Sequence, residues 1–308
     1  MKKYLGILLF GSLVVSVKAQ ESSREPYMVK SLTAEAIQNV RVETTGGNIS
    51  VAGADAEARI EVYVWPGNSR DRNLSKDEIK KRLEADYDLS ISTDNHILTA
   101  IAKPKHEFRN WNSSLSISFK VFVPHNASTD LRTSGGNISL TALSGTQDFT
   151  TSGGNLNIDH LSGHVKGRTS GGNITLTDLQ DDIDLSTSGG NVHADEIEGE
   201  LAAHTSGGNV DMTNLSCSLE TSTSGGNIDV SIKTLGKYVK ITNSGGHIDL
   251  QVPQSQGMDL NLSADKVDAT ALSGFKGDIK KDRIEGSLNG GGIPVTVRGG
   301  SRINFTIK

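Results

Sequence analysis

The chain has 308 residues, of which 35% are hydrophobic, 5% are aromatic and 34 are glycine. This composition is too lean for one large compact core, yet no segment has the composition of a disordered tail. A net charge of −5 lacks the basic footprint that nucleic acids and anionic lipid surfaces require. The composition instead favours a narrow core that is repeated along an axis.

Residues 1–19 have the pattern of a signal peptide. A basic MKK precedes the apolar run YLGILLFGSLVVSV, and Val17 and Ala19 occupy the small-residue positions before a cleavage site. We therefore expect cleavage after Ala19, and export of a bacterial protein to the periplasm, the cell surface or the medium, with no transmembrane segment left. An N-terminal membrane anchor is the less favoured alternative because the run is short for a bilayer span. Without its three leader lysines, the chain has 28 basic and 36 acidic residues and a net charge of −8.

Residues 20–128 are predicted to form a β-rich cap region continuous with the repeats that follow. VRVETTGGNISVAG around Thr45 is an early copy of the later repeat, and ARIEVYVWPGNS alternates as a strand does. SKDEIKKRLEADYD is the one convincing helix, with Ser75 as its cap and Glu78 three residues later. LSISTDNHILTAIA indicates a hairpin around Asp94 and Asn95, and SLSISFKVFVP places five apolar residues on one strand face.

One aromatic and polar cluster stands out in the cap region. It consists of Trp65, His106, Phe108, Arg109 and Trp111, four of them within KHEFRNWN. Such a cluster can form an exposed loop that binds a sugar or a protein partner, so these five residues are the candidate partner-binding site. The alternative, which the sequence slightly favours, is a hydrophobic plug that seals the stack.

Residues 129–308 open with six lines of 18 residues that share the motif TSGGN. The motif begins at Thr133, Thr151, Thr169, Thr187, Thr205 and Thr223. A fixed period over this many copies indicates a repeat architecture. Each line is predicted to contain two short strands joined at the glycine pair, where positive φ angles are expected. A second, weaker turn falls at sequences such as LSG, and a looser copy of the motif follows from Val239.

Stacking the lines in register places equivalent residues in columns. Three columns are apolar, and the first comprises Ile138, Leu156, Ile174, Val192, Val210 and Ile228. Asn137 and its equivalents would form a ladder in which each amide bonds to the next rung, while the motif threonines point inward at the edge of the core. One rung cannot bury its apolar face alone, whereas a stack can. The sequence therefore predicts an all-β fold, a single-stranded parallel β-helix (β-solenoid) with 18-residue rungs and one short helix in the cap.

Other repeat folds fit the pattern less well. An ice-binding face needs two outward threonine columns, but the column two residues before each motif threonine is core-like. A calcium β-roll needs an aspartate at a fixed place after the glycines, and Asp159, Asp178, Asp195 and Asp211 share no single column. A left-handed coil wants an aliphatic residue at every sixth position, where this chain has Asn137, so a right-handed coil is favoured. No metal or cofactor is assigned.

Cys217 is the single cysteine, so no internal disulfide can form. It occupies a turn position held by Gly145, Gly163 and Gly199 in other lines, which favours a variable turn filler over a redox or attachment site. The tail from Gln254 loses the 18-residue period but still offers strands at MDLNLSA, IPVTVRGG and RINFTIK, which would cap the open end.

No catalytic site is predicted. Polysaccharide-cleaving β-helix enzymes gather acids and bases in a groove, usually on long rung insertions, and five of the six lines here have none. His160 and His164 flank an LSG turn and could meet, but solvated turn histidines are the favoured interpretation. No phosphate loop, hydrolase elbow or zinc spacing occurs, so an enzyme is a distant alternative.

The order of these segments resembles a known family. A leader, SKDEIKKRLEADYDLSISTDNHILTAIA, ISFKVFVPHNASTDLRTSGGNI and serial TSGGNI rungs are similar to a bacterial exported β-strand-repeat family of unknown function, whose members are described as candidate adhesins. The resemblance covers nearly the whole chain after the leader. It implies a β-helical binding scaffold at the cell surface or envelope, with a glycan or an envelope protein as partner and no catalytic residues to carry over. Similar relatives in envelope-stress systems imply the alternative of a periplasmic signalling or structural module.

Overall fold

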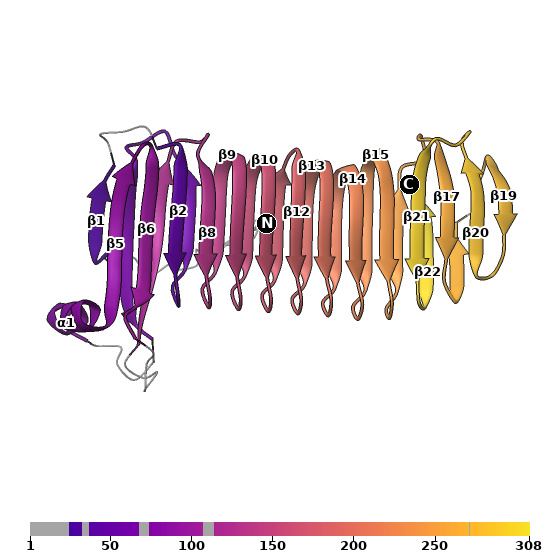
Figure 1. Cartoon of the computed structure of the whole chain (residues 1–308). Helices are drawn as coiled ribbons and strands as arrows, with labels where there is room; N and C mark the ends of the chain where they lie inside the picture. Colours follow the sequence, from indigo (N-terminus) through magenta and orange to yellow (C-terminus); the bar gives the residue numbers. More distant parts are fainter. Residues whose placement is uncertain (1–24, 33–36, 68–73, 107–113, 271) are drawn as a thin grey trace, which may run out of the picture.

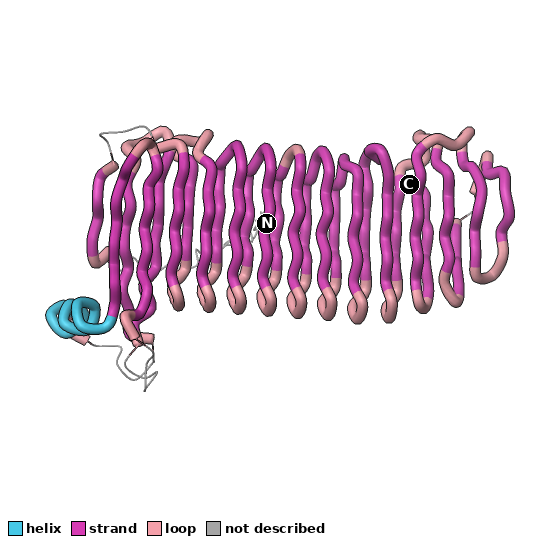
Figure 2. Tube along the Cα trace, in the orientation of Figure 1, coloured by secondary structure: helices cyan, strands magenta, loops and turns pink. Residues whose placement is uncertain are grey.

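The structure is a computed structural model that describes residues 25–32, 37–67, 74–106, 114–270 and 272–308. Strands dominate the described residues, which form a long, narrow stack with one helix at its N-terminal end (Figure 1). Along the middle of the stack, the loops lie at its two long edges (Figure 2). The all-β prediction with one short helix is therefore confirmed, while the predicted leader lies outside the described residues.

The strands form two faces with the core between them. Five long strands turn a corner midway and contribute to both faces: β9 (Ile138–Thr151), β10 (Leu156–Thr169), β13 (Val192–Thr205), β14 (Val210–Thr223) and β15 (Ile228–Asn243). The first face also contains β1 (Met28–Ser31), β4 (Arg59–Pro66), β7 (Leu115–Val123), β3 (Ile49–Gly53), β11 (Ile174–Leu179), β16 (Ile248–Val252), β22 (Arg302–Ile307) and β18 (Lys266–Ala269). The second face also contains β5 (Tyr87–Asp94), β6 (Ile97–Pro104), β2 (Asn39–Thr44), β8 (Ser128–Thr133), β12 (Asp182–Thr187), β21 (Ile293–Gly299), β17 (Met258–Ser263), β20 (Arg283–Leu288) and β19 (Phe275–Ile279).

The central rungs pair in parallel with an offset of 18 residues. Ile138 lies opposite Leu156, and Leu156 lies opposite Ile174. The predicted apolar columns are therefore physical columns, and their members are fully buried. The motif threonines are also buried, as predicted.

The paired glycines of the motif do not serve the purpose expected from the sequence. None of them has φ in the left-handed region, so the predicted positive φ angles are wrong. The second glycine instead permits close stacking, because a Cβ on Gly172 would overlap the carbonyl group of Gly154 in the preceding rung. A Cβ on Gly171 would meet only ordinary contacts, the nearest being 3.7 Å from the Ser152 oxygen.

Threonine and asparagine connect each turn to the one before it. The Thr187 Oγ1 donates to the Gly172 carbonyl oxygen at 2.8 Å and accepts from the Gly190 N–H at 3.3 Å. The Asn191 N–H donates to the Asn173 Oδ1 at 2.8 Å. Both patterns recur at the other motif copies, so the predicted asparagine ladder is confirmed, with the side-chain oxygen as acceptor and the next backbone N–H as donor.

The second turn of each rung supplies the positive φ angles. A column of residues without glycine adopts the left-handed conformation there: Ala142, His160, Asp178, Glu196 and Asn214. Three residues later Gly145, Gly163 and Gly199 also have positive φ. Cys217 lies opposite Gly199, as the alignment predicts, but its φ is not in this region and its thiol is buried, which raises the thiol pKa to about 12.

The rungs at the N-terminal end are out of sequence order. β2 and β3 pair with β8 and β9 on one side and with β6 and β7 on the other. The chain therefore leaves its first rung, adds β4, α1 (Lys76–Asp86) and β5 at the end of the stack, and then crosses back. The helix begins at the predicted cap, where the Glu78 N–H donates to the Ser75 Oγ, and the predicted hairpin turns at Asn95 and His96.

The C-terminal end repeats the same exchange. β21 and β22 pair with β15 and β16, so RGGSRI forms a further glycine turn that the loss of period conceals. β17 and β18 pair on the outer side of this rung although they precede it in sequence. The antiparallel strands β19 and β20 then end the second face. The three predicted tail strands are confirmed, while β18, β19 and β20 were not predicted.

Candidate functional site

The outward side chains of the first face form a continuous column along the stack. Cross-strand pairing links Glu61, Lys120, Ser50, Ser139, Asn157, Thr175, His193, Asp211, Asp229, Asp249, Asn304 and Asp268 in that spatial order. Each step is one strand spacing, about 4.8 Å. The column is basic and acidic at its N-terminal end, uncharged in the middle and largely acidic toward the C-terminal end.

Three aspartates on successive rungs create the most acidic part of this column. Asp211, Asp229 and Asp249 line a shallow depression of about 270 Å³, together with Ser231 and Asn304. Partial burial raises the pKa of Asp229, and a hydrogen bond with Asp249 and the charges of Asp249 and Asp211 raise it further. Asp249 also accepts from the Asn304 Nδ2. The sequence analysis noted that four other acids share no column but missed this one.

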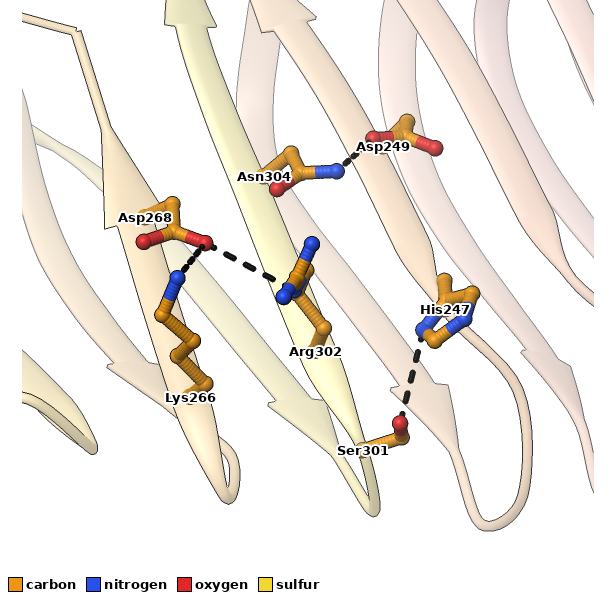
Figure 3. Close-up of polar contacts among 7 residues, drawn as sticks. All are labelled: His247, Asp249, Lys266, Asp268, Ser301, Arg302 and Asn304. Atoms are coloured by element: carbon orange, nitrogen blue, oxygen red, sulfur yellow. Dashed lines mark hydrogen bonds and ion pairs between the residues drawn. The ribbon is translucent and has the colours of Figure 1, made fainter.

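Beyond Asn304 the charges are paired (Figure 3). The Lys266 Nζ lies 2.7 Å from the Asp268 Oδ2, and the Arg302 Nε lies 3.6 Å from the same oxygen. The hydrogen bond from Lys266 lowers the pKa of Asp268. These contacts neutralise the C-terminal end of the column, which separates it from the three aspartates.

The outward side chains of β4 form a second feature at the opposite end of the first face. The Arg59 guanidinium lies 3.7 Å from the centre of the Phe122 ring, and its Nε donates to the Glu61 Oε1 at 2.9 Å. The Tyr63 hydroxyl donates to the Glu61 Oε2 at 2.8 Å, and the Tyr63 and Trp65 rings stack with centres 6.4 Å apart. We call these four β4 residues with Phe122 and Lys120 the β4 strip.

The β4 strip is electrostatically organised. Burial alone would raise the pKa of Glu61, but the hydrogen bonds from Arg59 and Tyr63 outweigh it and lower the pKa. Burial and the hydrogen bond to Glu61 raise the pKa of Tyr63 to about 12. Glu61 is therefore a carboxylate and Tyr63 a neutral phenol at physiological pH.

The predicted partner-binding residues are only partly described. Trp65 is partly exposed on β4 beside Tyr63, whereas exposed His106 follows β6 and has its Nε2 3.4 Å from the Asp86 Oδ1. Phe108, Arg109 and Trp111 lie outside the described residues. Arg59, Glu61 and Tyr63, which the sequence analysis did not select, are the partners that accompany Trp65; their signal was the alternation in ARIEVYVWPGNS.

The turn histidines pair with acids of their own and the next rung. The His160 ring lies 2.7 Å from an Asp159 oxygen and 3.3 Å from an Asp178 oxygen, and the bond to Asp159 raises the histidine pKa. The His164 ring pairs with Asp182 at 2.8 Å. Each histidine is thus exposed in an ion pair along the stack, in agreement with solvated turn histidines.

Two further searches concern only the described part of the chain. Within it, no group of three or more histidine, cysteine, aspartate or glutamate side chains has a metal-binding arrangement. No helix within those same ranges is both long enough and apolar enough to cross a membrane.

A family model named Toastrack DUF4097 matches residues 12–297. The chain belongs to the Toastrack DUF4097 family. This assignment confirms the resemblance seen in the leader, the cap and the serial TSGGNI rungs. No curated protein is significantly similar to the toastrack chain.

Three solved structures are similar to the toastrack chain at low identity. A "putative adhesin" from Bacteroides fragilis is 13% identical, with 91% of this chain and 96% of that chain covered and a TM-score of 0.39. A "putative adhesin" from Parabacteroides distasonis is 10% identical, with 90% and 96% covered and a TM-score of 0.36. A "putative cell adhesion protein" from Clostridium sporogenes is 11% identical, with 91% and 98% covered and a TM-score of 0.21. At these TM-scores the three structures add no argument about this chain to the family assignment.

Proposed function

We propose that this toastrack chain is an exported, non-catalytic, right-handed β-solenoid that serves as an adhesin or binding scaffold at the cell surface or envelope. The observation that carries the proposal is the unbroken outward column of the first face, which crosses every rung from Glu61 to Asp268. A regular row of side chains at strand spacing suits an extended partner, such as a glycan chain or an envelope protein, because many weak contacts can form together.

The arrangement of acids supports a binding role over a catalytic one. Asp211, Asp229 and Asp249 follow one another along a single column, one rung apart. Glycoside hydrolysis instead needs two carboxyl groups on opposite sides of one bond, with a raised pKa on the acid. The depression beside these aspartates is shallow and open on the sheet surface, so it favours surface contact over enclosure of a substrate.

The test is binding of fluorescently labelled purified protein to whole bacterial cells and to a glycan array. We expect saturable binding to at least one of them. Absence of binding to both would overturn the proposal. A pull-down from envelope extracts that returned only envelope-stress membrane proteins would instead support the signalling or structural module.

A further inference from the structure

The β4 strip lies on the outer surface of the first face, at its N-terminal end. Along β4 the inward residues Ile60, Val62 and Val64 are buried, whereas the outward residues are only partly buried. The neighbouring strand β7 alternates in the same way and adds Lys120 and Phe122 beside them. The strip is therefore supported from below by the packed core.

Contacts within the strip hold its side chains in one arrangement. Phe122 supports the Arg59 guanidinium, Arg59 and Tyr63 bind the two oxygens of Glu61, and Tyr63 stacks with Trp65. Every outward side chain of β4 thus has a partner in the row. A surface whose side chains are already ordered loses little conformational entropy on binding, which favours affinity.

The two rings provide a flat apolar surface of sugar size. Their planes differ by 27°, and their centres are 6.4 Å apart along the strand. Tyrosine and tryptophan contribute large contact areas at low entropic cost, and with arginine they are the residues that most often dominate binding energy. The apolar faces of pyranose rings match such a surface, because one side of the sugar is apolar while its rim is polar.

The charges of the strip select among glycans. Arg59 and Lys120 outnumber Glu61, so the strip is locally positive on a chain whose net charge is −5. Arg59 uses its Nε on Glu61, and the terminal nitrogens of a guanidinium still carry donors that suit a carboxylate. The three aspartates lie seven strands away on the same face, about 34 Å, which is several Debye lengths at physiological salt.

We propose that the β4 strip binds an acidic polysaccharide, with sugar rings stacked on Tyr63 and Trp65 and sugar carboxylates at Arg59 and Lys120. This inference rests on the proposed binding function and specifies its partner. A uronic-acid polymer fits the flat rings and the local positive charge together. A basic protein surface would meet repulsion from Arg59 and Lys120.

The test is affinity electrophoresis of the purified full chain in gels that contain polygalacturonate, with neutral dextran as the comparison polymer. We expect retardation by polygalacturonate only. Trp65→Ala and Lys120→Glu should each weaken binding by about tenfold or more, as for central binding residues. Asn157→Ala, an exposed change on the same face, should leave retardation unchanged.

Thermal melts followed by circular dichroism separate binding from folding. Lys120→Glu removes no ion pair within 4 Å, so this variant should fold even if Trp65→Ala is destabilised. Equal retardation by dextran, or unchanged polygalacturonate binding in folded Lys120→Glu protein, would overturn the inference. Protein that still bound cells in that case would leave the proposed function intact, whereas loss of all cell and glycan binding would overturn both.

Discussion

At the scale of single residues, the TSGGN motif maintains the distance between rungs. The second glycine lets one backbone approach the next, the threonine hydroxyl binds the carbonyl group exposed there, and the asparagine oxygen accepts the following N–H. In the looser copy, the Nδ2 of Asn243 takes the place of the threonine hydroxyl and donates to Gly226 at 2.8 Å. Each motif position therefore performs a hydrogen-bonding or steric task that recurs at every rung.

The two glycines of one turn should differ sharply in their tolerance of a side chain. Gly172→Ala places a Cβ against the Gly154 carbonyl and should lower the free energy of unfolding by about 2 kcal/mol or more. Gly171→Ala meets only ordinary contacts and should change it by less than about 0.5 kcal/mol. Urea unfolding of both variants measures the contrast, and equal effects would contradict the steric explanation.

The buried threonine hydroxyl should contribute stability that an outward threonine does not. Thr187→Val keeps the side-chain shape but leaves the Gly172 carbonyl and the Gly190 N–H without this partner, at a cost of about 1–3 kcal/mol. Thr175→Val, on the outward column, is the matched control and should cost less than about 0.5 kcal/mol. Chemical denaturation followed by circular dichroism distinguishes the two.

At the scale of one rung, two corners of different kinds close the coil. The TSGGN corner uses no left-handed residue, whereas the other corner places one in every regular rung, usually without glycine. A left-handed conformation costs most residues about 1 kcal/mol, while asparagine tolerates it better. Asn214 shows that the column accepts asparagine.

Relief of this backbone strain should stabilise the protein. Glu196 has φ of 58° and is exposed, so Glu196→Asn should raise the free energy of unfolding by about 0.5–1 kcal/mol. Glu198→Asn, two residues later and outside the left-handed region, serves as the control and should not stabilise. A matched gain in both variants would show that charge, and not backbone strain, is responsible.

At the scale of the whole molecule, stacking concentrates charges that lie far apart in the sequence. Asp211, Asp229 and Asp249 meet on one face, with His193 on β13 and Asn304 on β22 at the two ends of the group. Like charges directly opposite on neighbouring strands destabilise a sheet by about 0.2–1 kcal/mol. The native chain therefore tolerates a repulsive column, which is consistent with a surface kept for binding.

This repulsion predicts a pH dependence of stability. The pKa of Asp229 is higher in the folded state than in the unfolded chain, so the folded state loses stability as pH rises through that pKa. Asp229→Asn should therefore be more stable than wild type at pH 7, by about 0.5–1 kcal/mol. The difference should shrink as pH falls toward about 4, where carboxyl groups are protonated. Urea unfolding at a series of pH values measures it, and a gap that grew on acidification would contradict the assignment.

Much of the fold could be predicted from the sequence because the repeat period carries the register directly. Once lines of 18 residues are aligned, burial of columns such as Ile138, Leu156 and Ile174 follows, since a lone rung cannot bury its apolar face. The capped helix after Ser75 and the hairpin at Asn95 are set by local signals, so they were also predictable. The asparagine ladder followed from the same alignment.

The remaining features depend on contacts that no local pattern records. The reason for Gly172 lies in the neighbouring rung, and the exchanged order of rungs at both ends depends on which edges are left to pair. The column from Asp211 to Asn304 was hidden because the offset changes from 18 to 20 residues and then to 55. The sequence by itself thus determined the periodic core and its local signals, because their physics is repeated at fixed spacing. Only the tertiary structure decided the ends of the stack, the acidic column and the β4 strip, because each depends on pairing between segments outside the period.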